Sequence, residues 1–355
     1  MPSAWNKYGP TAARPHGKPG RSTRPQSVTI DIHSHVAVPA AAAYVKPHLD
    51  AAANPLAAFA TPETKELGQR QDVDRRSRMV ELDERLADLD AMGIDRQLVM
   101  PPPPQCYYTV PVEVAVKAAR MVNDGVAEYV ARKPDRFVAL GSVPMPDGNE
   151  AANELERCIR TLGFKGVQIL TNVAGNEISE AAYAPFWQKA EELGAIVLVH
   201  PNGFTEAKRL SRFYFNNVIG NPLETTIALH YLIFDGVLER HPDLKIIAVH
   251  GGGYLGGYSG RIDHVWGARS DARGELPQPP TSYLKKVYFD TVVFTPHQLE
   301  ALVKTFGVER ILLGTDYPYD MAEYDPLGHL ASVDTLDATA RAAIAGGNAK
   351  RLLGL

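Results

Sequence analysis

The chain contains 355 residues, of which 45% are hydrophobic, 22% charged and 8% aromatic, and its formal net charge is −4. That composition is typical of folded globular proteins and excludes a disordered or fibrous chain. The charge gives no reason to expect binding to nucleic acid or to an anionic membrane, and the apolar runs are far shorter than the ~20 residues that cross a bilayer. The two cysteines, Cys106 and Cys158, provide no disulfide framework, so we expect a cytoplasmic protein.

Residues 1–27 differ from the rest of the chain because they contain five basic residues and no acidic ones. Prolines and glycines interrupt any periodicity, and the apolar stretch of a signal peptide is missing. We therefore expect an N-terminal arm, which either lies on an acidic surface of its own or a partner subunit or is a disordered tail. Its basic residues are Lys7, Arg14, Lys18, Arg21 and Arg24.

Residues 28–355 repeat one pattern, in which a helical segment ends at a glycine and a short apolar run follows. Most of these runs are continuously apolar, as expected for parallel strands that are covered on both faces. Strands that alternate with helices in this way predict an α/β fold, and eight of them predict a (β/α)8 TIM barrel that forms a single domain. The predicted strands are 28–33, 97–100, 137–142, 166–170, 195–200, 244–250, 287–292 and 311–315.

One long loop is predicted at 36–73, where a segment rich in alanine and proline separates the first predicted strand from its helix. An insertion of this length in a compact domain usually covers an active site or contacts a partner. We predict a lid insertion over the mouth of the barrel.

Polar groups follow four of the predicted strands. His33 and His35 end the first strand, where residues two apart point to the same face. His200 ends the fifth strand, His250 ends the sixth, and Asp316 follows the eighth. All five lie at carboxyl ends of strands, where barrel enzymes have their active sites.

Imidazoles and a carboxylate are ligands that suit Zn²⁺, although other transition metals are possible. Three or four protein ligands leave a position for water, whose pKa the metal lowers. Either His200 or His250 by itself would more often be a hydrogen-bonded core residue. Five such groups at one end of the barrel favour a metal site, because burying them without a cation would cost several kcal/mol.

Four motifs in the chain resemble one family. They are Asp-Ile-His-Ser-His at 31–35, Gly-Phe-Lys-Gly-Val-Gln-Ile at 163–169, His-Gly-Gly-Gly at 250–253 and Gly-Thr-Asp-Tyr-Pro at 314–318. Together they resemble the aminocarboxymuconate semialdehyde decarboxylase branch of the amidohydrolase superfamily. The resemblance extends from about residue 28 to the end of the chain. His33, in place of a glutamate, favours this subgroup over the related hydroxybenzoate-type decarboxylases.

The resemblance implies a zinc ion held by His33, His35, His200 and Asp316, with His250 as the acid or base that acts on the bound water. The residues alone do not distinguish His250 from a fifth ligand. Some amidohydrolases hold two metals with a carboxylated lysine that ends the fourth strand. Lys165 precedes this strand instead, so we expect one metal ion.

Two arginines match substrate-binding positions of the family. Guanidinium groups bind carboxylates in a bidentate manner. The resemblance implies that Arg85, on the first helix, contacts a substrate carboxylate and that Arg269 does so across a dimer interface. We therefore expect a homodimer or a higher homo-oligomer.

The sequence thus predicts a zinc-dependent decarboxylase of an unsaturated or aromatic carboxylic acid, with no organic cofactor and with His250 and Asp316 as catalytic residues. A metal-dependent hydrolase of a lactone or an amide, or a hydratase, is the alternative, because the same centre can activate water for either reaction.

Overall fold

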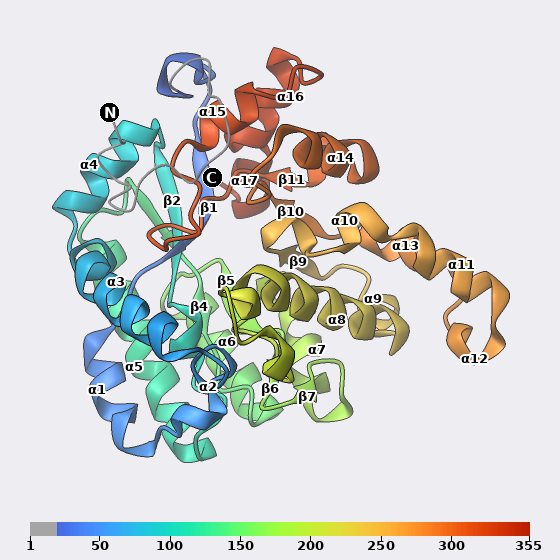
Figure 1. Cartoon of the computed structure of the whole chain (residues 1–355), viewed down its shortest axis with the longest axis horizontal. Helices are drawn as coiled ribbons and strands as arrows, with labels where there is room; N and C mark the ends of the chain where they lie inside the picture. Colours follow the sequence, from blue (N-terminus) through green and yellow to red (C-terminus); the bar gives the residue numbers. More distant parts are fainter. Residues whose placement is uncertain (1–19) are drawn as a thin grey trace.

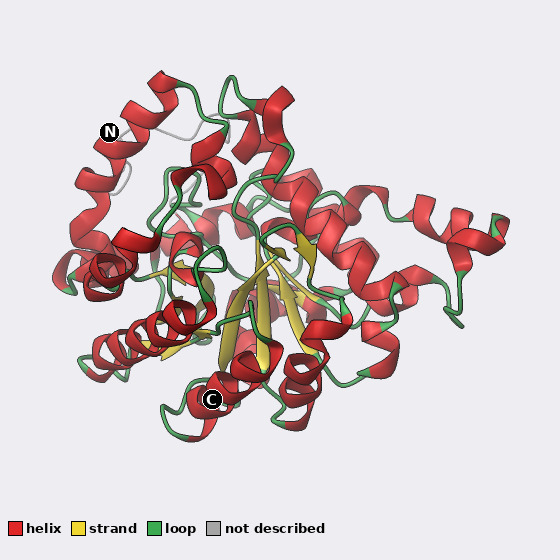
Figure 2. Ribbon diagram, turned by 90° about the horizontal axis from the view of Figure 1, so that it is seen from below, coloured by secondary structure: helices red, strands yellow, loops and turns green. Residues whose placement is uncertain are grey.

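The computed structural model describes residues 20–355, and its core is a ring of parallel strands surrounded by helices (Figure 1, Figure 2). Every strand pair of the ring is parallel, which confirms the predicted α/β class. In ring order the strands are β1 (Ile30–His35), β2 (Arg96–Met100), β3 (Phe137–Ala139) with β4 (Gly141–Ser142), β5 (Gly166–Leu170), β8 (Ile196–His200), β9 (Lys245–Ala248), β10 (Tyr288–Asp290) and β11 (Ile311–Leu312).

Backbone hydrogen bonds close the ring at two points. The strand β3 continues into β4 through Leu140, whose N–H donates to Val99 O at 2.9 Å. Between the last strand and the first, the N–H groups of Ile32 and His35 on β1 donate to Leu313 O (2.9 Å) and Tyr317 O (2.8 Å), which follow β11. The eight predicted strand positions therefore form one barrel. The bounds of β5 match the predicted strand 166–170. The β9 strand ends two residues before its predicted end at residue 250, and β11 ends three residues before its predicted end at residue 315.

Helices form the outer layer because each presents an apolar face to the strands. In α5, for example, Val114, Ala118, Val122 and Val126 are buried at helical spacing. A second set of buried residues fills the interior of the ring, and Ile196 and Leu198 of this set share the strand face of His200. The larger helices are α3 (Pro62–Val80), α4 (Asp83–Met92), α5 (Val112–Ala131), α6 (Gly148–Arg160), α7 (Ala184–Glu192), α8 (Asn221–Phe234), α11 (Gly260–Ala268) and α14 (Pro296–Phe306).

Short elements complete the outer layer. The β6 and β7 strands (Asn172–Val173 and Asn176–Glu177) form an antiparallel hairpin. Two π-helical turns, η7 (Asn216–Gly220) and η10 (Ala343–Gly347), precede α8 and α17. The remaining short helices are α9 (Val237–Arg240), α10 (Leu255–Tyr258), α12 (Ser270–Arg273), α13 (Pro280–Leu284), α15 (Pro326–Ala331), α16 (Ala338–Ala342) and α17 (Asn348–Leu353). Figure 1 shows α11 and α12 projecting from the body of the molecule.

The predicted insertion, 36–73, is largely helical, so its interpretation as one long loop was wrong. It contains α1 (Pro39–Val45), α2 (Pro55–Ala58) and the first half of α3 (Pro62–Val80). Alanine has the highest helix propensity, and each of these helices has its proline in the first turn, where no N–H is needed. Asn54 and Thr61 cap α2 and α3. The composition that was read as a loop therefore encodes short helices, and the boundary at residue 73 falls inside α3.

The predicted arm, 1–27, lies mostly outside the described residues. Its described part contains a 3-10 turn, η1 (Gly20–Thr23), and Arg24, whose Nη2 lies 2.7 Å from Asp95 Oδ2. Among residues 20–355, no helix is both long enough and apolar enough to cross a bilayer.

Candidate metal centre

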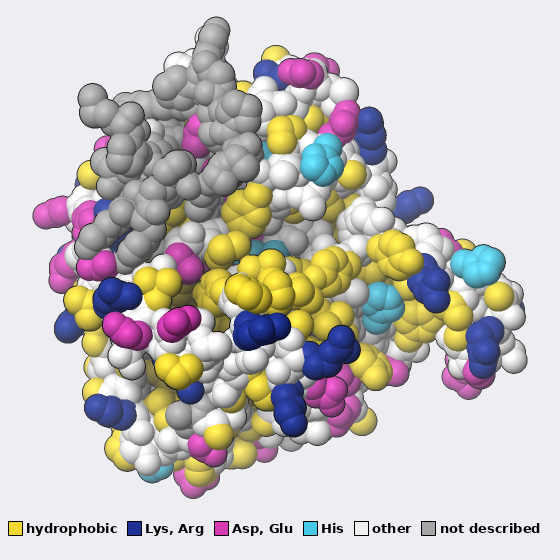
Figure 3. Space-filling view, in the orientation of Figure 1, with side chains coloured by type: hydrophobic (Ala, Val, Ile, Leu, Met, Phe, Trp, Pro, Cys, Tyr) yellow, Lys and Arg dark blue, Asp and Glu magenta, His cyan; other side chains and the backbone are white. Residues whose placement is uncertain are grey.

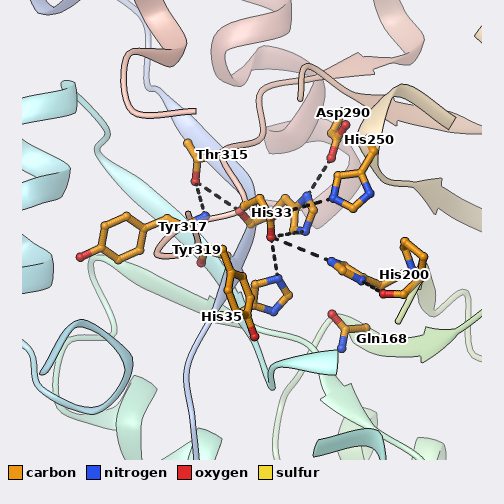
Figure 4. A network of polar contacts seen from close by, with 12 residues as sticks. His33, His35, Gln168, His200, His250, Asp290, Thr315, Tyr317 and Tyr319 are labelled. Atoms are coloured by element: carbon orange, nitrogen blue, oxygen red, sulfur yellow. Dashed lines mark hydrogen bonds and ion pairs between the residues drawn. The ribbon is translucent and has the colours of Figure 1, made fainter. Parts of the chain in front are cut away.

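The strand ends bring all five predicted metal-site groups together, and Figure 4 shows the four imidazoles converging. The carboxylate of Asp316 lies at their centre. Its Oδ1 is 3.1 Å from His35 Nε2, 3.3 Å from His33 Nε2 and 4.0 Å from His200 Nε2. Its Oδ2 is 3.5 Å from His250 Nε2. Residues from β1, β8 and the segments after β9 and β11 thus converge on one buried point.

Three of the four imidazoles have the same fixed tautomer. The Nδ1 of His33 lies 2.7 Å from the Asp290 carboxylate, that of His35 lies 3.1 Å from Pro101 O, and that of His200 lies 2.6 Å from Pro201 O. Carbonyl and carboxylate oxygens accept hydrogen bonds, so Nδ1 carries the proton in each ring. Each Nε2 faces the carboxylate of Asp316 and would offer its lone pair when a metal ion replaces the proton between them, as metal-binding histidines do.

His250 differs from these three. Its Nδ1 is buried but has no hydrogen-bond partner among the described residues, so no neighbour fixes its tautomer. Its side chain is 15% exposed, whereas those of His33 and His35 are fully buried. One set of ligand atoms within 4.8 Å of one another contains His33, His200, His250 and Asp316. The geometry therefore allows His250 to be either a ligand or an acid and base.

The electrostatics of the centre favour a cation. Burial raises the pKa of Asp316, but His33 and the other imidazoles oppose it and hold this pKa well below its usual range. Burial lowers the pKa of His33, but the carboxylates of Asp316 and Asp290 overcome this and raise it to about 10. Burial and the neighbouring imidazoles lower the pKa of His200 to about 3. The carboxylates thus require positive charge, and a divalent cation supplies it.

The residues present fit such an ion. The Nε2 atoms of His33 and His200 are buried and make no hydrogen bond to any described residue. An unpaired buried nitrogen of this kind is costly unless a ligand occupies its lone pair. Imidazoles with one carboxylate form a donor set that suits a divalent transition metal.

Sequence reasoning missed Asp290, which supports the centre from the end of β10. Its Oδ2 accepts from His33, and its Oδ1 accepts from the backbone N–H of Gly251 (2.8 Å) and Val292 (3.2 Å). It is fully buried. A carboxylate at the end of the seventh strand was the available signal, since its position matches those of the histidines on other strands.

A second buried carboxylate, Asp31, connects three strands beneath the histidines. Its Oδ2 accepts from Gln97 Nε2 (2.7 Å) on β2 and from Thr315 Oγ1 (2.6 Å) after β11. Its Oδ1 accepts from the N–H of His33. Burial raises the pKa of Asp31 to about 6, although these hydrogen bonds oppose the shift.

Arg85, predicted to bind substrate, lies behind the histidines. Its side chain is fully buried and donates to Gln97 Oε1 at 2.7 Å and to the carbonyls of Arg78 and His35. Its guanidinium also lies 4.8 Å from the ring centre of Tyr317. Binding of a substrate carboxylate by Arg85 would require it to release one of these acceptors.

Arg269, the other predicted substrate residue, does not join the cluster within this chain. It lies between α11 and α12, which project from the body (Figure 1). Its side chain is 64% exposed and forms an ion pair with Asp271 at 2.6 Å.

A third arginine, Arg75 on α3, lies near the centre and was missed. It lines a cavity of about 740 Å³ together with Tyr214, Tyr319 and Asp320. Its guanidinium lies 5.0 Å from the ring centre of Tyr319, and that ring lies 5.2 Å from the ring of His35. The side chain is 11% exposed, and Nη1, 3.7 Å from Asp320, makes no hydrogen bond to a described residue. It lies two residues beyond the predicted insertion, 36–73, and no signal in the sequence set it apart from the other basic residues there.

Comparison with known proteins places this geometry in a family. A family model for amidohydrolases matches residues 30–355. The 2-amino-3-carboxymuconate-6-semialdehyde decarboxylase of Dictyostelium discoideum is 34% identical over 274 residues, which are 77% of this chain and 76% of that protein. The gamma-resorcylate decarboxylase of Rhizobium radiobacter is 30% identical over 291 residues, 77% of this chain and 87% of that protein.

A solved structure agrees with these matches. The dihydroxybenzoic acid decarboxylase of Polaromonas sp. JS666, determined with bound manganese and the inhibitor 2-nitroresorcinol, superposes with a TM-score of 0.78 at 25% sequence identity. The match covers 93% of this chain and 98% of that one. The family match over nearly the whole described barrel, together with these relatives, shows that the chain belongs to the amidohydrolase family.

Proposed function

We propose that this protein is a metal-dependent decarboxylase of an unsaturated or aromatic carboxylic acid. The observation that carries this proposal is the set of inward Nε2 atoms around Asp316, in a chain whose relatives include decarboxylases. The names of the relatives' substrates share one feature. Both 2-amino-3-carboxymuconate semialdehyde and gamma-resorcylate carry an amino or hydroxyl group on the atom next to the one that bears the carboxylate. We extend this feature to the substrate of this chain.

We assign the metal to His33, His35, His200 and Asp316, because the first three have a fixed Nδ1–H and an inward Nε2. Zn²⁺ suits this donor set, and Mn²⁺, which the Polaromonas relative contains, is the other candidate. When bound, the metal would act as a Lewis acid that polarises the substrate oxygens.

His250 is the proton donor and acceptor in this proposal. Its Nε2 faces Asp316 at 3.5 Å, and its Nδ1 has no partner among the described residues. A proton on this imidazole is transferred to the substrate carbon that bears the carboxylate. The C–C bond then breaks, its electron pair restores the double bond that the protonation used, CO2 leaves, and solvent returns a proton to His250. Asp316 Oδ2, 3.5 Å from this Nε2, orients the imidazole.

We assign substrate binding to Arg75. The predicted substrate-binding roles of Arg85 and Arg269 remain alternatives to this assignment. Arg75 and Lys65 are basic residues that line the cavity that Tyr319 also lines. Arg75 is the one beside Tyr319, and its Nη1 makes no hydrogen bond to a described residue. Arg85 holds the carbonyl of His35, so it positions a metal ligand. Arg269 lies between α11 and α12, which project from the body (Figure 1), and would reach a site only in a second copy.

A homodimer is the assembly that we propose. Figure 3 shows hydrophobic side chains gathered across the middle of one face. The exposed apolar residues of this region include Phe213 (72% exposed), Phe215, Val218, Tyr254 and Tyr258 (67% exposed), and a patch of this kind marks a contact surface. A second copy covers it in our proposal.

The proposed dimer predicts a change of mass when its apolar surface is charged. Light scattering should give the mass of a dimer for the wild type, and a Phe213→Asp/Tyr258→Asp variant should give that of a monomer. A monomeric wild type would contradict the assignment.

The proposed reaction predicts CO2 release that depends on both metal and His250. Protein loaded with Zn²⁺ or with Mn²⁺ should release CO2 from at least one acid in a panel of 2-hydroxybenzoates, 2-aminobenzoates and muconates, and metal-stripped protein should not. His250→Ala should lose at least about 100-fold in kcat, the size expected for a general acid, while its metal content stays equal to that of the wild type. Headspace CO2 and elemental analysis provide the two readings.

Two results would contradict different parts of this account. Loss of metal from His250→Ala would make His250 a ligand. Absence of CO2 from the whole panel with metal bound would favour the hydrolase or hydratase alternative, which lactones, amides and unsaturated acids would then test.

Replacing Arg75 should weaken substrate binding. Arg75→Met removes a charge-assisted hydrogen bond to the carboxylate, which is worth about 1.5–3 kcal/mol, so kcat/KM should fall roughly 10-fold to 150-fold, mainly through KM. Arg76→Met is the matched control, because Arg76 is the next residue on α3 but is exposed. Steady-state kinetics should show the loss in the first variant alone. Equal kinetics in both variants would exclude Arg75 from the substrate site.

A further inference from the structure

Only the nitrogen of the Gln168 side-chain amide, on β5, is hydrogen-bonded to a described residue. The side chain is fully buried. Its Nε2 donates to Pro101 O at 3.0 Å and lies 3.4 Å from Cys106 Sγ. Its Oε1 is buried and has no hydrogen-bond partner among the described residues. An acceptor left unpaired in this way costs about 1–3 kcal/mol unless a ligand or water supplies a donor.

The orientation of this amide is fixed. Pro101 O can only accept, and it already accepts from Nδ1–H of His35 at 3.1 Å. Rotating the amide by half a turn would bring Oε1 against this carbonyl and place two acceptors in contact. The carbonyl group of Gln168 therefore faces the other way, and Figure 4 shows its oxygen on the side of His200 and His35.

Other buried glutamines of the barrel do not share this feature. Gln97 donates to Asp31 and accepts from Arg85. Gln105 accepts from Val38 N (3.0 Å) and donates to Val38 O (3.1 Å), so both ends of its amide are paired. The unpaired oxygen of Gln168 is thus specific to the residue beside the metal centre.

No described residue donates to Oε1, so its donor is water or a group of the molecule that enters the centre. The substrate carboxylate has only acceptors, and the Nε2 atoms of His33, His35 and His200 face Asp316. The remaining donor is the hydroxyl or amino group on the atom next to the carboxylate-bearing carbon. We infer that Gln168 Oε1 accepts a hydrogen bond from that group and makes it a requirement for binding. This inference rests on the proposed function, since it assigns the selection of its substrate to one residue.

A pair of ligands that cannot lose CO2 tests the inference. In 2-nitroaniline the nitro group stands for the carboxylate and the neighbouring amino group is a donor, whereas 2-fluoronitrobenzene has no donor at that position. Metal-loaded wild type should bind the first more tightly by roughly 5-fold to 150-fold, the range that corresponds to the cost of an unpaired buried acceptor. Gln168→Met should bring this ratio close to one, and Gln105→Met, the matched control, should keep the wild-type ratio. Calorimetry gives both dissociation constants, and elemental analysis confirms equal metal content.

Each other outcome overturns the inference. A Gln168→Met variant that keeps the ratio, or that binds both ligands equally more weakly, would show that the amide only supports Pro101 and the fold. A wild type that shows no preference, or that binds neither ligand, would show that Oε1 meets water rather than a substrate group. The proposed function is tested separately: if the ratio changes as expected while no acid releases CO2, the decarboxylase assignment fails and the donor-selecting role of Gln168 stands.

Discussion

The carboxylate of Asp316 is buried among four imidazoles, and much of the structure serves to make that arrangement stable. A buried charge without compensation is strongly unfavourable. The chain supplies part of the compensation through His33, whose pKa rises to about 10 under the influence of Asp316 and Asp290 once the opposing effect of burial is overcome. The same concentration of negative charge and lone pairs attracts a divalent cation. The metal is therefore expected where the electrostatic demand is greatest.

The backbone at this point is held in an uncommon conformation. His250 and Asp316 both have positive φ, 54° and 60°, which costs a residue other than glycine about 1 kcal/mol or more. Hydrogen bonds on both sides maintain it. Asp316 N donates to His33 O at 2.8 Å, and Gly251 N donates to the carboxylate of Asp290. Asp290 thus fixes the ring of His33 and the turn after His250 together.

The sequence was sufficient for the barrel and for the residues around Asp316. Short apolar runs identified the strands, because parallel strands are covered on both faces, and four of these runs follow a glycine that ends a helical segment. Polar residues at the ends of such runs stand out, so the histidines were found. Asp290, Arg75 and Gln168 were not, because their importance lies in contacts with residues far away in the chain. Gln168 lies inside a strand and is notable only for an acceptor that the folded structure leaves unpaired. The helices of the insertion were missed because alanine and proline were read as loop residues rather than as helix formers with prolines in the first turn.

The position of the metal tests the central claim most directly. Crystals of the metal-loaded protein, measured at the absorption edge of the metal, would locate it by anomalous scattering. The account predicts a single peak within about 2.0–2.2 Å of Nε2 of His33, His35 and His200 and of a carboxylate oxygen of Asp316, with Nδ1 of His33 still bonded to Asp290. No peak among these residues, or a peak bound by His250 in place of His35, would contradict it.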